Sequence, residues 1–211
     1  MKSDNRIKEL QLLFEISQVL DQSLDLNQVI GPVLNTVADH LSIIHGAITL
    51  LNRQTGEINI EGAYGLSRSE REKGRYRLGE GVTGTVIQTG MPRVIPKVSE
   101  DPAFLNRTGA RRTQKAKDFS FVCVPIKIGN EVAGAFSIDR PLADSVELEE
   151  NVRILSVIAS MIAQAVKIRQ TVMEERRQLI AENTRLQEEL RERFKPSNII
   201  GNSKVMQNVY D

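Results

Sequence analysis

Apolar side chains in the first part of the chain lie three and four positions apart, the spacing of a helix that packs on one side. This spacing predicts a first helix over residues 5–20, whose apolar positions are Ile7, Leu10, Leu13, Phe14, Ser17 and Leu20. After a polar break, Asp25 is placed to cap a second helix over residues 26–43. Pro32 fits that helix only in its first turns, because proline has no N–H to donate.

Shorter runs follow, with the alternation of strands. Residues 47–51 and 58–64 are predicted strands, separated by a turn at Gln54–Gly56. Residues 82–89 predict a short helix ended by Gly90 and Pro92, and a strand fragment at 94–95 stops at Pro96. Residues 97–118 read as a loop with one helical turn after Asp101-Pro102.

The clearest strands are 119–126 and 131–140, and Gly129-Asn130 between them is suited to a two-residue hairpin turn. From about residue 146 to 194 the pattern is helical again. The predicted fold is therefore α+β, with a mostly antiparallel sheet of about six strands flanked by helices and a long C-terminal helix.

The long helix carries one seam of alternating three- and four-residue spacing. Off-seam positions become strongly charged after Lys167, so we expect a regulatory domain over 1–168 and a linker helix over 169–194 that pairs with a second chain as a parallel coiled coil. A solvated single helix and a helix folded back on the domain remain alternatives. The predicted dimer seam is Leu155, Ile158, Ile162, Val172, Leu179, Asn183, Leu186 and Leu190.

Composition narrows the function classes. The 211 residues hold 28 Lys and Arg against 27 Asp and Glu, which lacks the cationic excess of a dedicated nucleic-acid binder. One cysteine and two histidines leave no intrachain disulfide, no cysteine-built metal site and little material for catalysis. With no signal peptide and no membrane-spanning run evident, we expect a cytoplasmic protein that is not an enzyme and holds no metal.

Two segments resemble binding motifs. Gly79–Gly84 matches G-x-G-x-x-G, but a charged segment precedes it and no lysine follows, so a tight turn into a short helix is favoured over a phosphate loop. The basic loop contains Arg107, Arg111, Arg112, Lys115 and Lys117, which indicate either a solvated surface or an anion site.

Few other side chains suggest chemistry. Cys123 lies mid-strand and is expected to be a buried structural thiol, on the opposite face from Val122 and Val124. His40 and His45 lack a second ligand at metal-site spacing, and Asp139 and Glu131 have no identifiable partner in the sequence.

Three segments carry a family resemblance: GEGVTGTVIQTG at 79–90, PRVIP at 92–96 and VPIKIGNEVAGAFSIDR at 124–140. In this order they resemble a GAF domain. EDPAFLNRTGARR at 100–112 is similar to the sensor domain of nitrogen-fixation activators of the NifA type. FKPSNIIGNSKVMQNVY at 194–210 resembles the opening of the AAA+ ATPase of sigma-54-dependent activators, which places the start of that domain at 195–211.

The resemblance implies a module that senses a small molecule or partner protein and controls the ATPase, which acts on sigma-54 RNA polymerase in the full-length protein. It also implies a pocket between the sheet and the layer formed by 75–89 and 102–118, for an effector such as 2-oxoglutarate or a cyclic nucleotide. No cofactor is certain, and direct DNA or membrane binding by this segment is not expected. The candidate ligand contacts are Arg77, Thr83, Phe104, Asn106, Arg107, Arg111 and Arg112.

Two other functions stay open at this point. The domain could be a protein-interaction and dimerisation module without a small-molecule ligand. It could also be a thiol-dependent reductase, although such chemistry wants a resolving thiol beside Cys123 and the chain has one cysteine.

Overall fold

The computed structural model describes residues 2–23, 25–110 and 118–193 and divides the chain into two units, Met1–Ile168 and Arg169–Asp211. The regulatory domain expected over 1–168 and the linker helix expected over 169–194 stay predictions. The last predicted segment, 195–211, lies outside the described residues. The elements are α1 Lys2–Asp21, α2 Leu26–Leu41, β1 His45–Leu51, β2 Glu57–Tyr64, α3 Arg68–Lys73, β3 Arg75–Arg77, α4 Gly81–Thr89, β4 Arg93–Ile95, the 3₁₀ turn η1 Val98–Glu100, β5 Phe119–Ile128, β6 Glu131–Pro141 and α5 Ser145–Arg193.

The first unit is built on a six-stranded sheet of order β3-β2-β1-β6-β5-β4, in which every neighbouring pair is antiparallel. The α+β prediction is confirmed. The β5–β6 hairpin turns at Gly129-Asn130 as expected, and Gly129 supplies the positive φ of +63° that such a turn needs. Edge strand β3 and helix α3 escaped sequence analysis because their segment is polar and charged.

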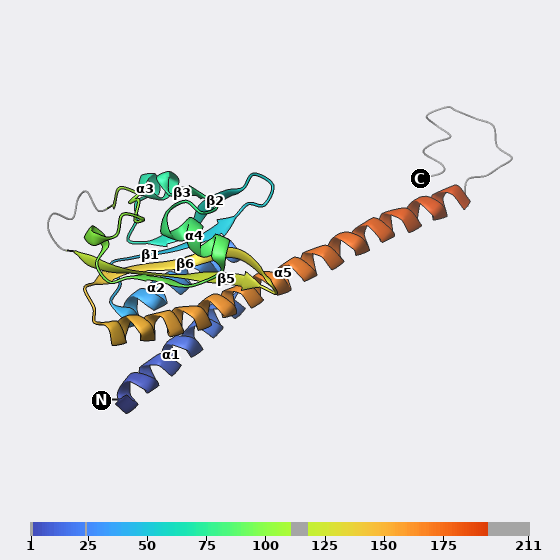
Figure 1. Ribbon diagram of the computed structural model, residues 1–211. Helices are drawn as coiled ribbons and strands as arrows, with labels where there is room; N and C mark the ends of the chain where they lie inside the picture. Colours follow the sequence, from blue (N-terminus) through green and yellow to red (C-terminus); the bar gives the residue numbers. More distant parts are fainter. Residues whose placement is uncertain (1, 24, 111–117, 194–211) are drawn as a thin grey trace. The chain divides into compact units, whose positions relative to one another are not determined.

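The sheet is covered on both faces (Figure 1). On one face α1, α2 and the first part of α5 pack against Val122, Val124, Phe136 and Ile138. On the other face α4 packs against a smaller core that includes Phe121, Cys123 and Ala135. Consecutive residues of β5 therefore alternate between two cores, as strand geometry requires.

Two predictions about helix faces need correction. Helix α1 buries Leu12, Ile16 and Leu20, while Ile7, Leu10 and Phe14 are 55%, 67% and 63% exposed. On α5, the predicted seam residues Leu155, Ile158 and Ile162 are at most 1% exposed and pack in the core of the domain, so they are not available to a dimer. The same three–four spacing serves a core-facing helix and a coiled coil.

One stretch of α5, Ser145–Ile168, is long and apolar enough by length and composition to cross a membrane, which sequence analysis did not anticipate. Its residues Leu148, Leu155 and Ile158 are 2% exposed or less and pack against the sheet. The core helix of a soluble protein has this same composition.

Strand β6 approaches β1 so closely at Gly134 that there is no room for a side chain. A Cβ at Gly134 would lie 2.0 Å from the backbone oxygen of Thr49, so Gly134→Ala should lower the free energy of unfolding by about 1–3 kcal/mol. Gly31→Ala is the matched control, since its Cβ would meet no atom within 4 Å beyond the excluded neighbours, and its change should stay within about 1 kcal/mol. Urea unfolding measures both, and equal stabilities would contradict the close approach.

Candidate functional site

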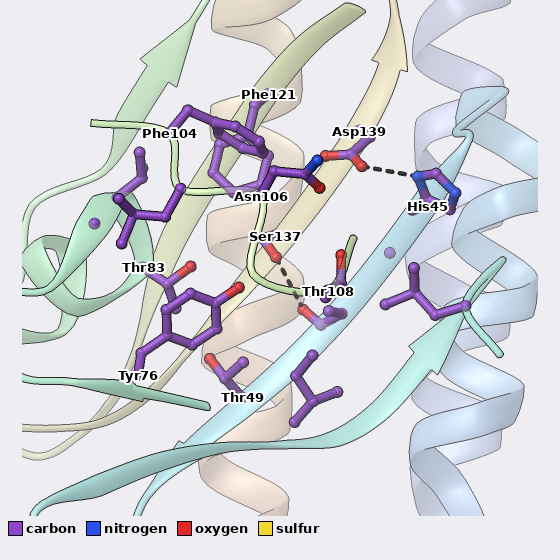
Figure 2. Close-up of a pocket in the computed structure, with 17 residues that line it drawn as sticks. His45, Thr49, Tyr76, Thr83, Phe104, Asn106, Thr108, Phe121, Ser137 and Asp139 are labelled. Atoms are coloured by element: carbon purple, nitrogen blue, oxygen red, sulfur yellow. Dashed lines mark hydrogen bonds and ion pairs between the residues drawn. The ribbon is translucent and has the colours of Figure 1, made fainter. Parts of the chain in front are cut away.

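A cavity lies on the face of the sheet that α4 covers (Figure 2). Its volume is about 60 Å³, enough for a few water molecules or a small ligand. Strands β1, β5 and β6 form its floor, and the start of α4 and the loop after Asp101 lie over it. The lining residues are His45, Gly46, Ala47, Thr49, Ile60, Leu66, Tyr76, Gly81, Val82, Thr83, Phe104, Leu105, Asn106, Thr108, Phe121, Ser137 and Asp139.

A buried hydrogen-bonded pair lines one side of the cavity. His45 on β1 and Asp139 on β6 are direct partners in the sheet, and His45 Nδ1 lies 2.9 Å from Asp139 Oδ2. They are 9% and 5% exposed. Asp139 therefore has the partner that sequence analysis could not identify, and His45 is held in place rather than offered as a metal ligand. No group of three metal-ligating side chains occurs among the described residues.

The strand floor is polar. Thr49 Oγ1 donates to the Ala135 carbonyl at 3.2 Å, and Ser137 Oγ donates to the Ala47 carbonyl at 3.5 Å. Both hydroxyl oxygens remain able to accept a hydrogen bond. Because side chains alternate along β1, His45, Ala47 and Thr49 point to the same face and line the cavity together. Figure 2 shows His45 and Thr49 on this strand.

The glycine-rich segment forms a tight turn, as expected. The Gly79 N–H donates to the Gly84 carbonyl at 3.0 Å, and the Gly84 N–H donates to the Glu80 carbonyl at 3.1 Å. Gly84 must be glycine, because a Cβ would lie 2.2 Å from the Arg77 oxygen. These N–H groups are spent inside the turn rather than on a phosphate. The first residues of α4, Gly81–Thr83, line the cavity. They belong to the N-terminal end of the helix, where the backbone N–H groups have no partner within the helix.

The arginines predicted to contact a ligand are not among the described residues that line the cavity. Neither Arg77 nor Arg107 lines the cavity. The Arg107 guanidinium forms an ion pair with Glu80, whose carboxylate also accepts the Arg77 N–H at 2.9 Å. Arg111 and Arg112 are outside the described residues. Of the predicted contacts, the structure brings together Thr83, Phe104 and Asn106.

The loop above the cavity is held by aromatic and polar contacts. The Phe104 ring packs edge-on against Phe121, with centroids 5.2 Å apart. Asn106 has a φ of +45°, and its buried Oδ1 has no partner among the described residues. The side chains of Asn106 and Asp139 point toward each other (Figure 2). The single turn expected after Asp101 is present: the Phe104 N–H donates to the Asp101 carbonyl at 3.2 Å, and Asp101 Oδ1 accepts the Ala103 N–H at 2.8 Å. A 3₁₀ turn at Val98–Glu100, which sequence analysis did not expect, precedes it.

Sequence analysis missed Thr49, Tyr76 and Ser137, and gave His45 and Asp139 no binding role. The alternation of β1 could have shown that His45 and Thr49 share a face. It could not have shown that β6 lies beside β1, because 94 positions separate His45 from Asp139.

The family model described as GAF domain matches residues 25–166 of this chain. The chain belongs to the GAF domain family. The nitrogen fixation protein VnfA of Azotobacter vinelandii is 43% identical over 206 residues, covering 97% of this chain and 40% of that protein. The Nif-specific regulatory protein of Herbaspirillum seropedicae is 38% identical, covering 96% of this chain and 37% of that protein.

Among solved structures, the GAF domain of A. aeolicus nlh2, crystallised in an inactive state, superposes with a TM-score of 0.70. It is 30% identical, covering 78% of this chain and 99% of that one. The chain is thus a GAF domain of the type found in Nif-specific regulatory proteins, a regulatory sensing domain. It spans about two fifths of the length of the relatives named above.

Cys123 of this GAF domain is fully buried beside the cavity, and burial raises the pKa of its thiol to about 12 despite a hydrogen bond with Thr83. The thiol therefore stays protonated at neutral pH, which makes it a poor nucleophile. This disfavours the thiol-dependent reductase.

The raised pKa of Cys123 predicts a pH dependence of stability. The folded chain holds this proton more tightly than the unfolded chain, whose thiol pKa is about 8.5. The stabilisation is complete below that pH and is lost as pH rises toward 12, by about 1.4 kcal/mol per pH unit. Urea unfolding between about pH 8 and 11 should show a steeper decline in the wild-type chain than in Cys123→Ala. Parallel declines would contradict the raised pKa.

Proposed function

We propose that this GAF domain senses a small molecule in the cavity and passes the signal through α5 to the AAA+ ATPase of a full-length sigma-54-dependent activator. The observation that carries the proposal is the position of the cavity relative to α5. Asp139 lines the cavity, and the next residue of β6, Arg140, lies on the other face with its Nη2 3.5 Å from Glu147 Oε2 of α5. The residue that lines the cavity and the residue that contacts α5 are therefore neighbours along β6.

A ligand changes the state of a protein only if it binds two arrangements with different affinity. Here a carboxylate ligand that takes the place of Asp139 beside His45 would move the end of β6. The Arg140–Glu147 contact at the first turns of α5 would move with it. This supports the linker helix as the route of the signal, with sigma-54 RNA polymerase as the final target of the ATPase.

The effector that fits best is a small carboxylate, for which 2-oxoglutarate is our first candidate. The start of α4 and the Thr83 hydroxyl offer donors to a carboxylate. A cavity of about 60 Å³ favours such a small molecule over a cyclic nucleotide, our second candidate.

Calorimetric titration with 2-oxoglutarate, cAMP and cGMP tests the ligand. We expect 2-oxoglutarate to bind, and Thr83→Val to weaken its affinity about tenfold or more, because a hydrogen bond to a charged group contributes about 1.5–3 kcal/mol. Arg77→Gln is the control, since Arg77 is outside the cavity lining and its loss should leave the affinity unchanged. Titrations without heat, together with unchanged melting temperatures for all three compounds, would count against these effectors.

We further propose that the chain is a homodimer held by the second part of α5. The seam residues there are exposed, with Val172 at 40%, Leu179 at 71%, Leu186 at 46% and Leu190 at 54%. Large apolar side chains on one helical face are expected to be covered in a soluble protein. Asn183, at the seam spacing between them, favours a two-stranded register.

Substitution on the seam tests this dimer. The double variant Leu179→Glu, Leu186→Glu should sediment as a monomer, because it puts charges where apolar side chains meet. Gln178→Glu with Thr184→Glu adds the same charge off the seam and should remain dimeric. A chain ending at Ile168 places the interface: a monomer assigns it to the second part of α5, and an unchanged dimer assigns it to the GAF domain.

A second candidate function is a protein-interaction module that receives its signal from a partner protein, without a small-molecule ligand. The exposed row of Ile7, Leu10 and Phe14 on α1 favours this candidate, since an apolar helix face is a common docking surface. In either case we expect a non-catalytic, cytoplasmic segment that contacts neither DNA nor membrane directly.

A further inference from the structure

The loop over the cavity is fastened at two points along its described part, residues 101–110. At its start, Arg93 Nη2 of β4 donates a hydrogen bond to Asp101 Oδ2 at 3.2 Å. Further along, the Arg107 guanidinium forms its ion pair with Glu80, the residue that directly precedes α4. The loop therefore reaches from β4 to the start of α4.

The Arg107–Glu80 ion pair lies at the edge of the cavity. Arg107 stands between Asn106 and Thr108, which both line the cavity (Figure 2). Glu80 precedes Gly81, which lines the cavity too. The side chains of the pair are 46% and 29% exposed, and an ion pair that water reaches contributes little to stability. The contact can therefore break at little cost to the fold.

Of the two partners, Glu80 is the fixed one. Its Oε2 accepts the Arg77 N–H at 2.9 Å, and its own N–H donates to the Arg77 carbonyl at 3.0 Å. Arg107 carries its charge at the end of a long side chain on a loop. When the pair separates, Arg107 is thus the group that moves, and Glu80 stays at the end of β3.

A dicarboxylate effector needs a cation that the cavity lining does not supply. The described lining residues include neither lysine nor arginine, and they already carry the Asp139 carboxylate. Burying further negative charge there is unfavourable unless a cation pairs with it. A guanidinium fits a carboxylate with two parallel hydrogen bonds, and Arg107 carries a guanidinium at the edge of the cavity.

We propose that Arg107 exchanges partners. In the free chain Glu80 holds it outside the cavity, and in the occupied chain it pairs with one carboxylate of the effector while the start of α4 and Thr83 receive the other. Arg107 then determines specificity for a dicarboxylate. Glu80 is an internal competitor that lowers affinity, because its carboxylate must be displaced first. The inference rests on the carboxylate effector proposed above.

Calorimetric titration of the whole chain with 2-oxoglutarate tests the exchange. Arg107→Gln removes the cation and should weaken binding about tenfold or more. Glu80→Gln releases Arg107 and should strengthen binding about threefold, a small gain because the released ion pair is partly exposed. The glutamine oxygen can still accept the Arg77 N–H, so the turn is kept. The double variant should bind as weakly as Arg107→Gln alone, because no cation is left for Glu80 to hold.

Arg53→Gln is the matched control for these variants. It removes a similarly exposed ion pair, with Glu131, whose members do not line the cavity, so affinity should stay unchanged. Unchanged affinity in Arg107→Gln, or weaker binding in Glu80→Gln, would overturn the exchange alone. Absence of binding in the wild-type chain and in Glu80→Gln alike would overturn the effector and the exchange together.

A monocarboxylate separates recognition from a merely structural role of Arg107. 2-Oxobutyrate lacks the second carboxylate of 2-oxoglutarate, so it should bind the wild-type chain more weakly and lose nothing further in Arg107→Gln. An equal loss of affinity for both compounds would mean that Arg107 maintains the shape of the site, and would contradict its pairing with a carboxylate.

Amide hydrogen exchange tests the Glu80 contact without any ligand. Glu80→Gln should speed exchange in residues 103–110 about threefold at an unchanged melting temperature, because this loop loses a contact with the start of α4. Arg53→Gln should leave exchange in these residues as it is. Equal exchange in the wild-type chain and Glu80→Gln would show that Glu80 does not hold the loop, and would overturn the proposal whatever the titrations give.

Discussion

The structure depends on one constraint: the central strands of the sheet are buried on both faces. Strand β5 is buried from Phe119 through Val124 without a break, and β1 and β6 contribute residues to both sides. Because successive side chains of a strand point in opposite directions, one sheet must supply two separate cores. The face of the sheet that α1, α2 and α5 cover is filled by large side chains, such as Phe136 and Ile138. The other face carries smaller side chains, and there Ala47, Thr49 and Ser137 leave a cavity.

The same constraint relates sensing to output. Ligand recognition can occur on the face with small and polar side chains, while α5 packs on the face with large apolar ones. The sheet between them is a single layer, and at the end of β6 the distance along the chain is one residue, from Asp139 to Arg140. The His45–Asp139 pair holds that end of β6 against β1, and the Ile44 N–H donates to the Asp139 carbonyl at 2.7 Å.

Much of this fold could be predicted because its signals are local. The alternation of side chains predicted the two strands of the β5–β6 hairpin. Gly129-Asn130 predicted the turn between them, and Gly90 predicted the end of α4. The pairing of His45 with Asp139 could not be predicted, since it depends on which strands are neighbours. The assignment of Leu155 and Ile158 to a dimer was wrong for a physical reason: helical spacing shows which residues share a face, and is silent on what covers that face.

The single-residue step from Asp139, which lines the cavity, to Arg140, which contacts α5, has a consequence for genetics. A substitution at Asp139 changes the cavity wall, and one at Arg140 changes the contact with Glu147 of α5. Either substitution also affects the stretch of β6 backbone that the two residues share. If such a variant no longer responded to ligand, the loss could come from either face of β6 and could not be assigned to one of them. Residues on other elements, such as Thr83 on α4 for the cavity and Glu147 on α5 for the helix contact, are the positions where the two faces can be tested separately.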